Sequence, residues 1–288
     1  MRAIASKQTP VDPLMSDFAS SHVVRLEYRN VTMRFADSRN RGVLTAVQNV
    51  SFALRDGEVV SLIGPSGCGK STLLNIGSGL TAPSDGQAFV DGERVAGPNA
   101  HVAFMLQKDL LLPWRTVAEN VMFGVEIQGV PLAERKQRAQ TLLASFKLAE
   151  FSGHYPHQLS GGMRQRVALA RTLAVDPHVL LLDEPFSAVD AQTRMVLQRD
   201  LAQTLQRARK TALLITHDLS EAVTLSDRVL VMSKRPGTIV DEIKIDMPNR
   251  DNPIARRHDP KVNDYVAHLM DRLGIDHASL EAQAGGAA

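Results

Sequence analysis

The chain has 288 residues, of which 44% are hydrophobic and 22% are charged, a composition typical of a globular protein with one sizeable core. Its 33 basic and 31 acidic side chains give a net charge of +2, which predicts no nucleic-acid partner. The single cysteine, Cys68, excludes an internal disulfide, and no apolar run approaches the roughly 18 residues of a membrane-spanning helix.

In chain order, the hydrophobic pattern predicts strands alternating with helices. Residues 1–22 show no periodicity and are predicted to be a disordered leader. Helical periodicity follows Pro131 and Asp190, and a further helix is predicted around 262–273, before a disordered tail. This alternation indicates an α/β fold with a buried parallel sheet. The predicted strands are residues 23–28, 50–54, 58–63, 101–106, 179–182 and 212–216.

A glycine-rich segment follows the strand at 58–63 and precedes a helix-compatible run. Its glycines let the backbone aim successive N–H groups at one point, where the helix start adds positive charge. In such a P-loop, Lys70 reaches the β- and γ-phosphates and the Ser71 hydroxyl holds Mg²⁺, so the segment predicts a nucleoside triphosphate site. The predicted binding residues are Gly64, Pro65, Ser66, Gly67, Cys68, Gly69, Lys70, Ser71 and Thr72.

Cys68 lies at a variable position inside this loop. Electropositive surroundings favour the reactive thiolate form of a cysteine. We therefore expect a thiol reagent to inactivate the protein and bound ATP to protect it, although Cys68 also fits as a residue that only fills the loop.

Two carboxylates, Asp183 and Glu184, follow the apolar strand at 179–182. Ligands of α/β sheets bind at the carboxyl ends of the strands. Asp183 suits the Mg²⁺ of a Walker B site, and Glu184 suits the base that orients or deprotonates an attacking water. An acidic turn is the plainer interpretation, but the P-loop earlier in the chain favours the functional one.

Ser160, Gly161 and Gly162 open a second helix that carries basic side chains. A hydroxyl and exposed N–H groups at a helix N-terminus form an anion site, although Ser160 on its own would be an ordinary N-cap. The chain therefore has two helix starts suited to phosphate, of which only the P-loop carries a lysine.

Leu-Ser-Gly-Gly at 159–162, followed by this basic helix and by Asp-Glu-Pro at 183–185, resembles the signature of ABC transporter nucleotide-binding subunits. The resemblance covers about residues 23–240, and the motifs appear in the family's order. The remaining counterparts are Phe35 at the position that stacks on adenine, Gln107 of the Q-loop, Asp190 of the D-loop and the switch histidine His217.

The resemblance implies a P-loop NTPase (RecA-like) core with an antiparallel β subdomain and an inserted α-helical subdomain. The ATP-binding domain would span 23–245, with the helical subdomain at about 108–160. Residues 246–288 would form a C-terminal extension with one helix and a disordered tail.

The resemblance also implies ATP hydrolysis with Mg²⁺ in a head-to-tail dimer of two copies. Ser160, Gly161 and Gly162 of one copy would close over the ATP held by Lys70 of the other. The implied catalytic residues are Glu184, His217 and Gln107, and the implied Mg²⁺ ligands are Ser71, Gln107 and Asp183.

Taken singly, the residues outside the three main motifs have plainer interpretations. Phe35 fits a strand-end aromatic, Gln107 a polar strand end, Asp190 a helix N-cap and His217 a structural histidine. Only their position in the ordered set favours the functional interpretation.

The stretch Leu112–Val121 is similar to importers of the nitrate, sulfonate and taurine group. It implies transmembrane permease subunits as partners, indirectly a periplasmic solute-binding protein, and a peripheral place on the cytoplasmic face of the plasma membrane. Trp114 is expected either to anchor that interface or to cover the helical subdomain core. The subunit of an exporter and a soluble non-transport ABC ATPase remain as alternatives.

The sequence departs from the family at Gly77 and Ser78, where an apolar residue and alanine are usual. Glycine inside a helix costs about 0.5–1 kcal/mol relative to alanine. We therefore expect the helix after the P-loop to be locally weaker.

Overall fold

The computed structural model describes residues 23–37, 42–187 and 189–275. The predicted leader and the predicted disordered tail lie outside these residues. None of the helices described is both long enough and apolar enough to cross a membrane.

The N-terminal region forms an antiparallel sheet in the order β2-β1-β4-β5. Tyr28 pairs with Phe52 on β2 and with Ala88 on β4, which places β1 in the middle. Apolar residues on the inner face, among them Leu26 and Tyr28, are almost completely buried. The strands are β1 (Val24–Asp37), β2 (Gly42–Arg55), β4 (Asp85–Val90) and β5 (Glu93–Arg94).

The central sheet has the order β10-β9-β3-β8-β7-β6, and its strands are parallel except for the edge strand β10. Every residue of β3, β8 and β9 is buried, as expected of a parallel sheet that is covered on both faces. The strands are β3 (Val59–Ile63), β6 (Val102–Met105), β7 (Val179–Asp183), β8 (Thr211–Ile215), β9 (Arg228–Met232) and β10 (Ile239–Lys244).

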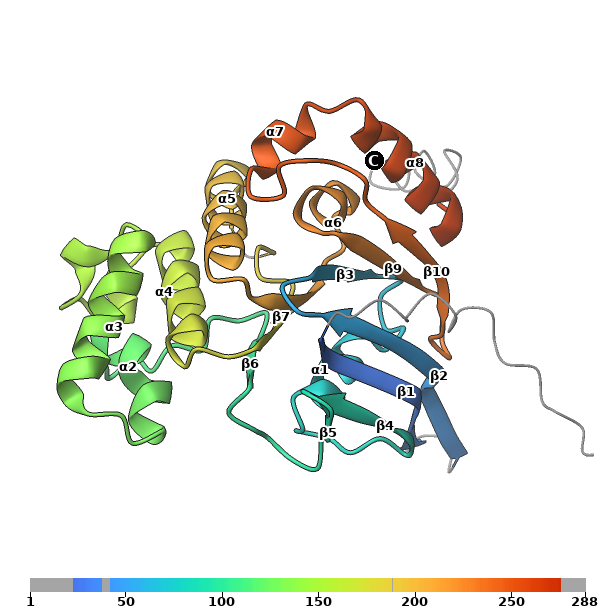
Figure 1. Cartoon of the computed structure of the whole chain (residues 1–288), viewed down its shortest axis with the longest axis horizontal. Helices are drawn as coiled ribbons and strands as arrows, with labels where there is room; N and C mark the ends of the chain where they lie inside the picture. The colour runs from blue at the N-terminus through green and yellow to red at the C-terminus, as the bar shows by residue number, and fades with distance from the viewer. Residues whose placement is uncertain (1–22, 38–41, 188, 276–288) are drawn as a thin grey trace, which may run out of the picture.

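Helices cover the two faces of the central sheet. Leu181 and Leu213 pack with α1 (Lys70–Gly77) and the antiparallel sheet, whereas their neighbours Leu180 and Leu214 pack with α5 (Ala191–Arg207). Figure 1 shows α5, α6 (Leu219–Leu225) and the C-terminal helices on one side of the central strands and the antiparallel sheet on the other. The α/β fold expected from the alternating pattern is therefore observed.

A group of helices lies beyond β6, at one side of the molecule (Figure 1). It contains α2 (Val117–Ile127), α3 (Leu132–Ser145) and α4 (Gly161–Ala174). Ala139, Leu143 and Val167 are buried in the core that these helices share with the central sheet. The group extends past residue 160 because α4 packs on α2 and α3.

Within the described residues 246–275, the C-terminal extension holds two helices, whereas one was predicted. The additional helix α7 (Pro253–Arg257) is too short to show periodicity, and the Asn252 side chain caps it by accepting a hydrogen bond from the Ala255 N–H. The predicted helix is α8 (Lys261–Leu273), which buries Leu269 against α6.

Gly77 is the last residue of α1, and the space around it explains why a glycine stands there. A Cβ at this position would lie 2.2 Å from the Tyr28 hydroxyl, which donates a hydrogen bond to Leu73 O at 2.8 Å. The small residue therefore permits a buried contact between α1 and the antiparallel sheet. The expectation that glycine simply weakens the helix was incomplete, because it considered the helix alone.

Candidate functional site

An open cleft of about 350 Å³ lies at the carboxyl ends of the central strands, against the antiparallel sheet. It brings the P-loop together with residues that follow β7, β8 and β9. It also includes Phe35, whose side chain is 42% exposed and which pairs with Leu44 of β2. The cleft is lined by Phe35, Leu44, Ala46, Gly64, Ser66, Gly67, Gly69, Lys70, Ser71, Thr72, Glu184, Ile215, His217 and Arg235.

The P-loop connects β3 to α1 as the sequence predicted. Gly69 is the N-cap of α1 with φ 108°, and a Cβ there would lie 2.3 Å from a methyl group of Val47. Only glycine fits this turn, because both the conformation and the space exclude a side chain. The Lys70 ammonium group curls back over the loop and donates to Gly64 O at 2.7 Å and Pro65 O at 3.1 Å.

Cys68 belongs to the P-loop, and it is buried, with only 1% of its surface exposed. Its sulfur lies 3.9 Å from the Lys70 Nζ. Burial corrects the expectation of a reactive thiol, because a reagent in solution cannot reach the sulfur in this conformation. The interpretation that Cys68 fills the loop is the one that the structure supports.

Gln107, Glu184 and His217 follow three neighbouring strands, β6, β7 and β8, and meet at one carboxylate. Gln107 Nε2 donates to Glu184 Oε2 at 3.1 Å, and His217 Nδ1 lies 3.3 Å from the same oxygen. Glu184 also adopts a left-handed backbone conformation (φ 45°), while its N–H donates to Ile215 O at 3.0 Å. The parallel order of the strands thus gathers three polar groups that are distant in sequence.

Asp183 ends β7 and is half-buried next to the P-loop. Burial raises the pKa of its carboxyl group, the hydrogen bond with Ser71 lowers it, and the neighbouring charges of Glu184 and Lys70 act in opposite directions. Asp183 and Ser71 are therefore adjacent, as a shared cation site would require.

The Ser160 segment lies outside the lining of the cleft described above. Ser160 is exposed and caps α4, its Oγ accepting a hydrogen bond from Met163 N at 3.3 Å. Gly161, exposed, and Gly162, half-buried, form the first turn of α4. The structure thus places the two helix starts suited to phosphate in separate parts of one chain.

Asp190 is exposed and caps α5, because its carboxylate accepts a hydrogen bond from Thr193 N at 3.0 Å. Hydrogen bonds from the Thr193 side chain and from its backbone N–H lower the pKa of the Asp190 carboxyl. The capping role that the sequence left open is observed.

Trp114 is 71% exposed, so it does not cover the core of the helical group, which was one of its two expected roles. The loop that carries it is held from two sides. Asn120 of α2 donates to Leu112 O and Arg115 O, and Arg171 of α4 donates to Asp109 O at 2.6 Å and Leu110 O. A large exposed ring on a well-held loop is typical of a contact surface.

Sequence reasoning missed Arg235 and placed Ser187 in the D-loop without giving it a role of its own. Arg235 follows β9 and donates from Nε and Nη2 to Gly67 O, at 3.0 and 2.7 Å. The Ser187 hydroxyl lies 3.4 Å from Gln107 Nε2 and donates to Glu184 O at 3.1 Å. The position of Arg235 just after a strand was an available signal, but β9 itself had not been predicted.

Comparison with known proteins gives concordant matches. A family model described as "ABC transporter" matches residues 47–187. The taurine import ATP-binding protein TauB of Burkholderia pseudomallei is 44% identical over 237 residues, covering 81% of this chain and 91% of that protein. The nitrate import ATP-binding protein NrtD of Synechocystis sp. is 47% identical over 238 residues, covering 80% and 90% respectively.

Among solved structures, the dimeric ATP-binding cassette MJ0796 in a post-hydrolysis state, bound to ADP and Pi, has a TM-score of 0.68 and 31% identity. The match covers 77% of this chain and 99% of that one. This likeness confirms the predicted P-loop NTPase fold with its parallel and antiparallel sheets. With the cleft geometry and these identities together, the chain belongs to the ATP-binding proteins of ABC transporters, a family of ATPases.

Proposed function

We propose that this ATPase powers an ABC importer and that Glu184 is its catalytic base. The observation that carries the proposal is the meeting of Gln107 and His217 at Glu184 Oε2, beside the P-loop cleft. A carboxylate held between an amide donor and an imidazole is well placed to orient a water and accept its proton.

The cleft fits ATP in both shape and chemistry. Its open volume borders the P-loop, whose N–H groups and Lys70 suit a triphosphate. The Phe35 ring lies on the same lining and is exposed enough to stack on adenine. Gly64, Pro65, Ser66, Gly67, Cys68, Gly69, Ser71 and Thr72 complete the proposed loop.

The residues beside the P-loop also fit Mg²⁺. The half-buried Asp183 lies against Ser71, and burial raises the pKa of its carboxyl, so a dication would favour its charged form. Carboxylate, hydroxyl and amide oxygens are the ligands that Mg²⁺ prefers, so we assign Ser71, Asp183 and Gln107 to it. When bound, Mg²⁺ neutralises part of the charge on the phosphates.

The side chains of the cleft divide the reaction between them. Glu184 accepts the proton of the attacking water at Oε2, while the Gln107 amide keeps that carboxylate in position. Lys70 and His217 donate to the oxygens of the transferring phosphoryl group. Catalysis then consists of positioning and charge stabilisation, which dominate phosphoryl transfer.

A second copy of the chain is proposed to complete the site. The exposed N-terminus of α4, with Ser160, Gly161 and Gly162, lies outside the single-chain cleft and offers N–H groups to a phosphate. Asp190, exposed at the start of α5, is assigned to the same interface. The solved cassette that resembles this chain is described as dimeric, which supports this assembly.

The import direction is supported by relatives named as taurine and nitrate import proteins, and we infer a small anion or organic solute as the cargo. Trp114, on a loop held by α2 and by the signature helix α4, is proposed to dock against the permease. Movement of α4 during nucleotide binding would then be passed to the membrane subunits. The chain would lie on the cytoplasmic face of the plasma membrane, and the periplasmic solute-binding protein would act from the opposite side.

The permease contact can be tested by measuring capture of a candidate permease subunit by the purified ATPase. Trp114→Ala should reduce its capture by the ATPase at least tenfold and leave ATP hydrolysis by the free chain unchanged. Leu80→Ala removes an equally apolar side chain that is 60% exposed and lies after α1, so it serves as the matched control. Full capture by the Trp114 variant would contradict the proposed docking loop.

A further inference from the structure

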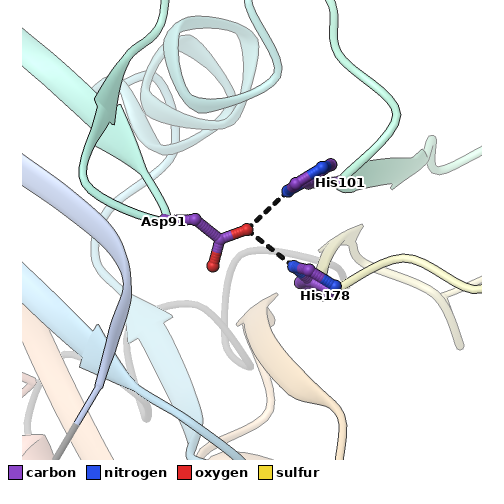
Figure 2. A group of neighbouring side chains, drawn as sticks. All are labelled: Asp91, His101 and His178. Atoms are coloured by element: carbon purple, nitrogen blue, oxygen red, sulfur yellow. Dashed lines mark hydrogen bonds and ion pairs between the residues drawn. The ribbon is translucent and has the colours of Figure 1, made fainter.

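Two histidines and one aspartate form a cluster at the amino ends of β6 and β7, opposite the nucleotide cleft. Asp91 lies in the turn between β4 and β5, His101 immediately precedes β6, and His178 immediately precedes β7. Figure 2 shows both imidazole rings directed at the Asp91 carboxylate. The function proposed above uses none of these residues.

The contacts within the cluster are short. His101 Nδ1 and His178 Nδ1 each lie 2.6 Å from the same oxygen, Asp91 Oδ2. The two ring centroids are 4.5 Å apart, and the backbone N–H of His178 donates to His101 O at 2.9 Å. This backbone hydrogen bond places the two histidines beside each other.

Charge in the cluster favours a cation. The Asp91 carboxylate pairs with the Arg25 guanidinium through Oδ1 at 2.7 Å, while its Oδ2 faces the two imidazoles. Arg25 also pairs with Asp56 at 2.7 Å, so the two carboxylates exceed the one guanidinium by one negative charge.

We propose that Asp91, His101 and His178 bind a divalent transition metal ion, with Zn²⁺ as the best match. Among the residues that the structure describes, these three are the one group of at least three His, Cys, Asp or Glu side chains whose ligand atoms all lie within 4.8 Å of one another. Two imidazole nitrogens with one carboxylate oxygen suit Zn²⁺ and disfavour Mg²⁺ and Ca²⁺, which prefer oxygen.

The contacts between Asp91 and the two histidines must lengthen when a metal ion binds. Ligand atoms of a tetrahedral Zn²⁺ site lie about 3.3 Å apart, given bonds of about 2.0–2.1 Å. The two Nδ1–Oδ2 separations of 2.6 Å must therefore widen by about 0.7 Å. Binding releases the two Nδ1 protons to solvent, and water completes the coordination, since His101 and His178 are 53% and 42% exposed.

Arg25 is placed to support this site from outside. Its Nη1 donates to Asp91 Oδ1 at 2.7 Å, which leaves Oδ2 free to face the histidines. Outer hydrogen bonds of this kind orient ligating carboxylates in metal sites. The ion would connect the antiparallel sheet with the first residues of two central strands, so binding should raise the melting temperature of the fold.

The site can be tested by titrating ZnCl₂ into the full-length chain without nucleotide. The test variant, His101→Asn/His178→Asn, keeps a short side chain that can donate to Asp91 but removes the imidazoles. The matched control, His157→Asn/His258→Asn, changes two exposed histidines elsewhere. All proteins also carry His217→Asn, which removes binding at the cleft.

The parent protein, which carries only His217→Asn, should bind one equivalent of Zn²⁺ at least tenfold more tightly than the test variant. The control should bind like the parent, and Zn²⁺ should raise the melting temperature of both but not of the test variant. Equal Zn²⁺ affinity in the test and control variants would overturn the proposal. The cluster would then be a set of hydrogen bonds that joins the two sheets. If the test variant fails to fold, ¹⁵N spectra of the parent decide, because unmoved Nδ1 signals of His101 and His178 would also overturn it.

Discussion

Polar clusters lie at both ends of the strands β6 and β7. The two clusters differ in the lengths of the contacts between their side chains. At the carboxyl end, Glu184 meets Gln107 and His217 over distances of 3.1 and 3.3 Å beside an open cleft. At the amino end, Asp91 binds two histidines at 2.6 Å and an arginine at 2.7 Å. The carboxyl end is built from loops, whereas the amino end joins two sheets through short contacts.

The difference separates catalysis from structural support. Catalytic side chains exchange hydrogen-bond partners during a reaction, and their hydrogen bonds are often long until the substrate is bound. Groups that hold segments together are served by short, charge-assisted hydrogen bonds. The following predictions test whether chemistry is confined to the carboxyl end.

The largest expected effect is on hydrolysis. Glu184→Gln keeps the size of the side chain but removes the proton acceptor, so kcat should fall by about 10²–10⁴-fold. Glu134→Gln, a similar change at a half-exposed carboxylate on α3, should leave kcat unchanged in the same phosphate-release assay. Near-normal turnover by Glu184→Gln would remove the proposed base.

The next effect concerns α1, which links the cleft to the antiparallel sheet. Gly77→Ala forces a methyl group onto the Tyr28 hydroxyl and should lower the free energy of unfolding by about 1–3 kcal/mol, measured with urea. In a Tyr28→Phe background the same change should cost less, because the obstructing oxygen is gone. Equal costs in both backgrounds would show that this contact is not the cause.

Glu221 of α6 lines a small cavity together with Glu184 and His217. We expect its titration to make the stability of the fold depend on pH. Burial and the Asp218 carboxylate raise the pKa of Glu221 from 4.5 to about 8. The folded chain therefore holds a proton between these values that the unfolded chain has lost, and stability decreases as pH rises through this range.

Glu221→Gln should remove this decrease. Between pH 6 and 7 the wild type should lose about 1 kcal/mol of unfolding free energy relative to the variant, at a limit of about 1.4 kcal/mol per unit. Parallel stability curves for the two proteins from pH 5 to 8 would show that Glu221 does not titrate in this way.

The smallest expected effect is on nucleotide affinity. Arg235→Ala removes two hydrogen bonds to Gly67 O, so the P-loop loses order and the Kd for ATP should rise about fivefold, near 1 kcal/mol. Lys234→Ala, at the exposed neighbouring position, should leave ATP affinity unchanged. Identical ATP affinity in the two variants would show that Arg235 does not support the loop.

The carboxyl end could be predicted from sequence because its motifs are local. Gly64–Ser71 and Asp183–Glu184 each occupy one stretch of chain, and the order of parallel strands brings their ends together. Long apolar runs likewise predicted β3, β7 and β8, because these strands are buried on both faces.

The amino end could not be predicted, because its residues meet only through tertiary structure. Asp91 comes from the antiparallel sheet, whereas His101 and His178 precede separate central strands. The same limit explains Gly77, whose partner Tyr28 is 49 positions away. Such contacts depend on register and packing, which local patterns do not specify.

The central claim is that two copies complete one hydrolytic site. Sedimentation of Glu184→Gln with ATP and Mg²⁺ tests it directly. This variant should bind ATP and hydrolyse it so slowly that the two copies stay together during the run. We predict a species of twice the mass of one chain with ATP and a single chain with ADP. A monomer at saturating ATP, alongside a wild type whose turnover per chain does not rise with protein concentration, would contradict the account.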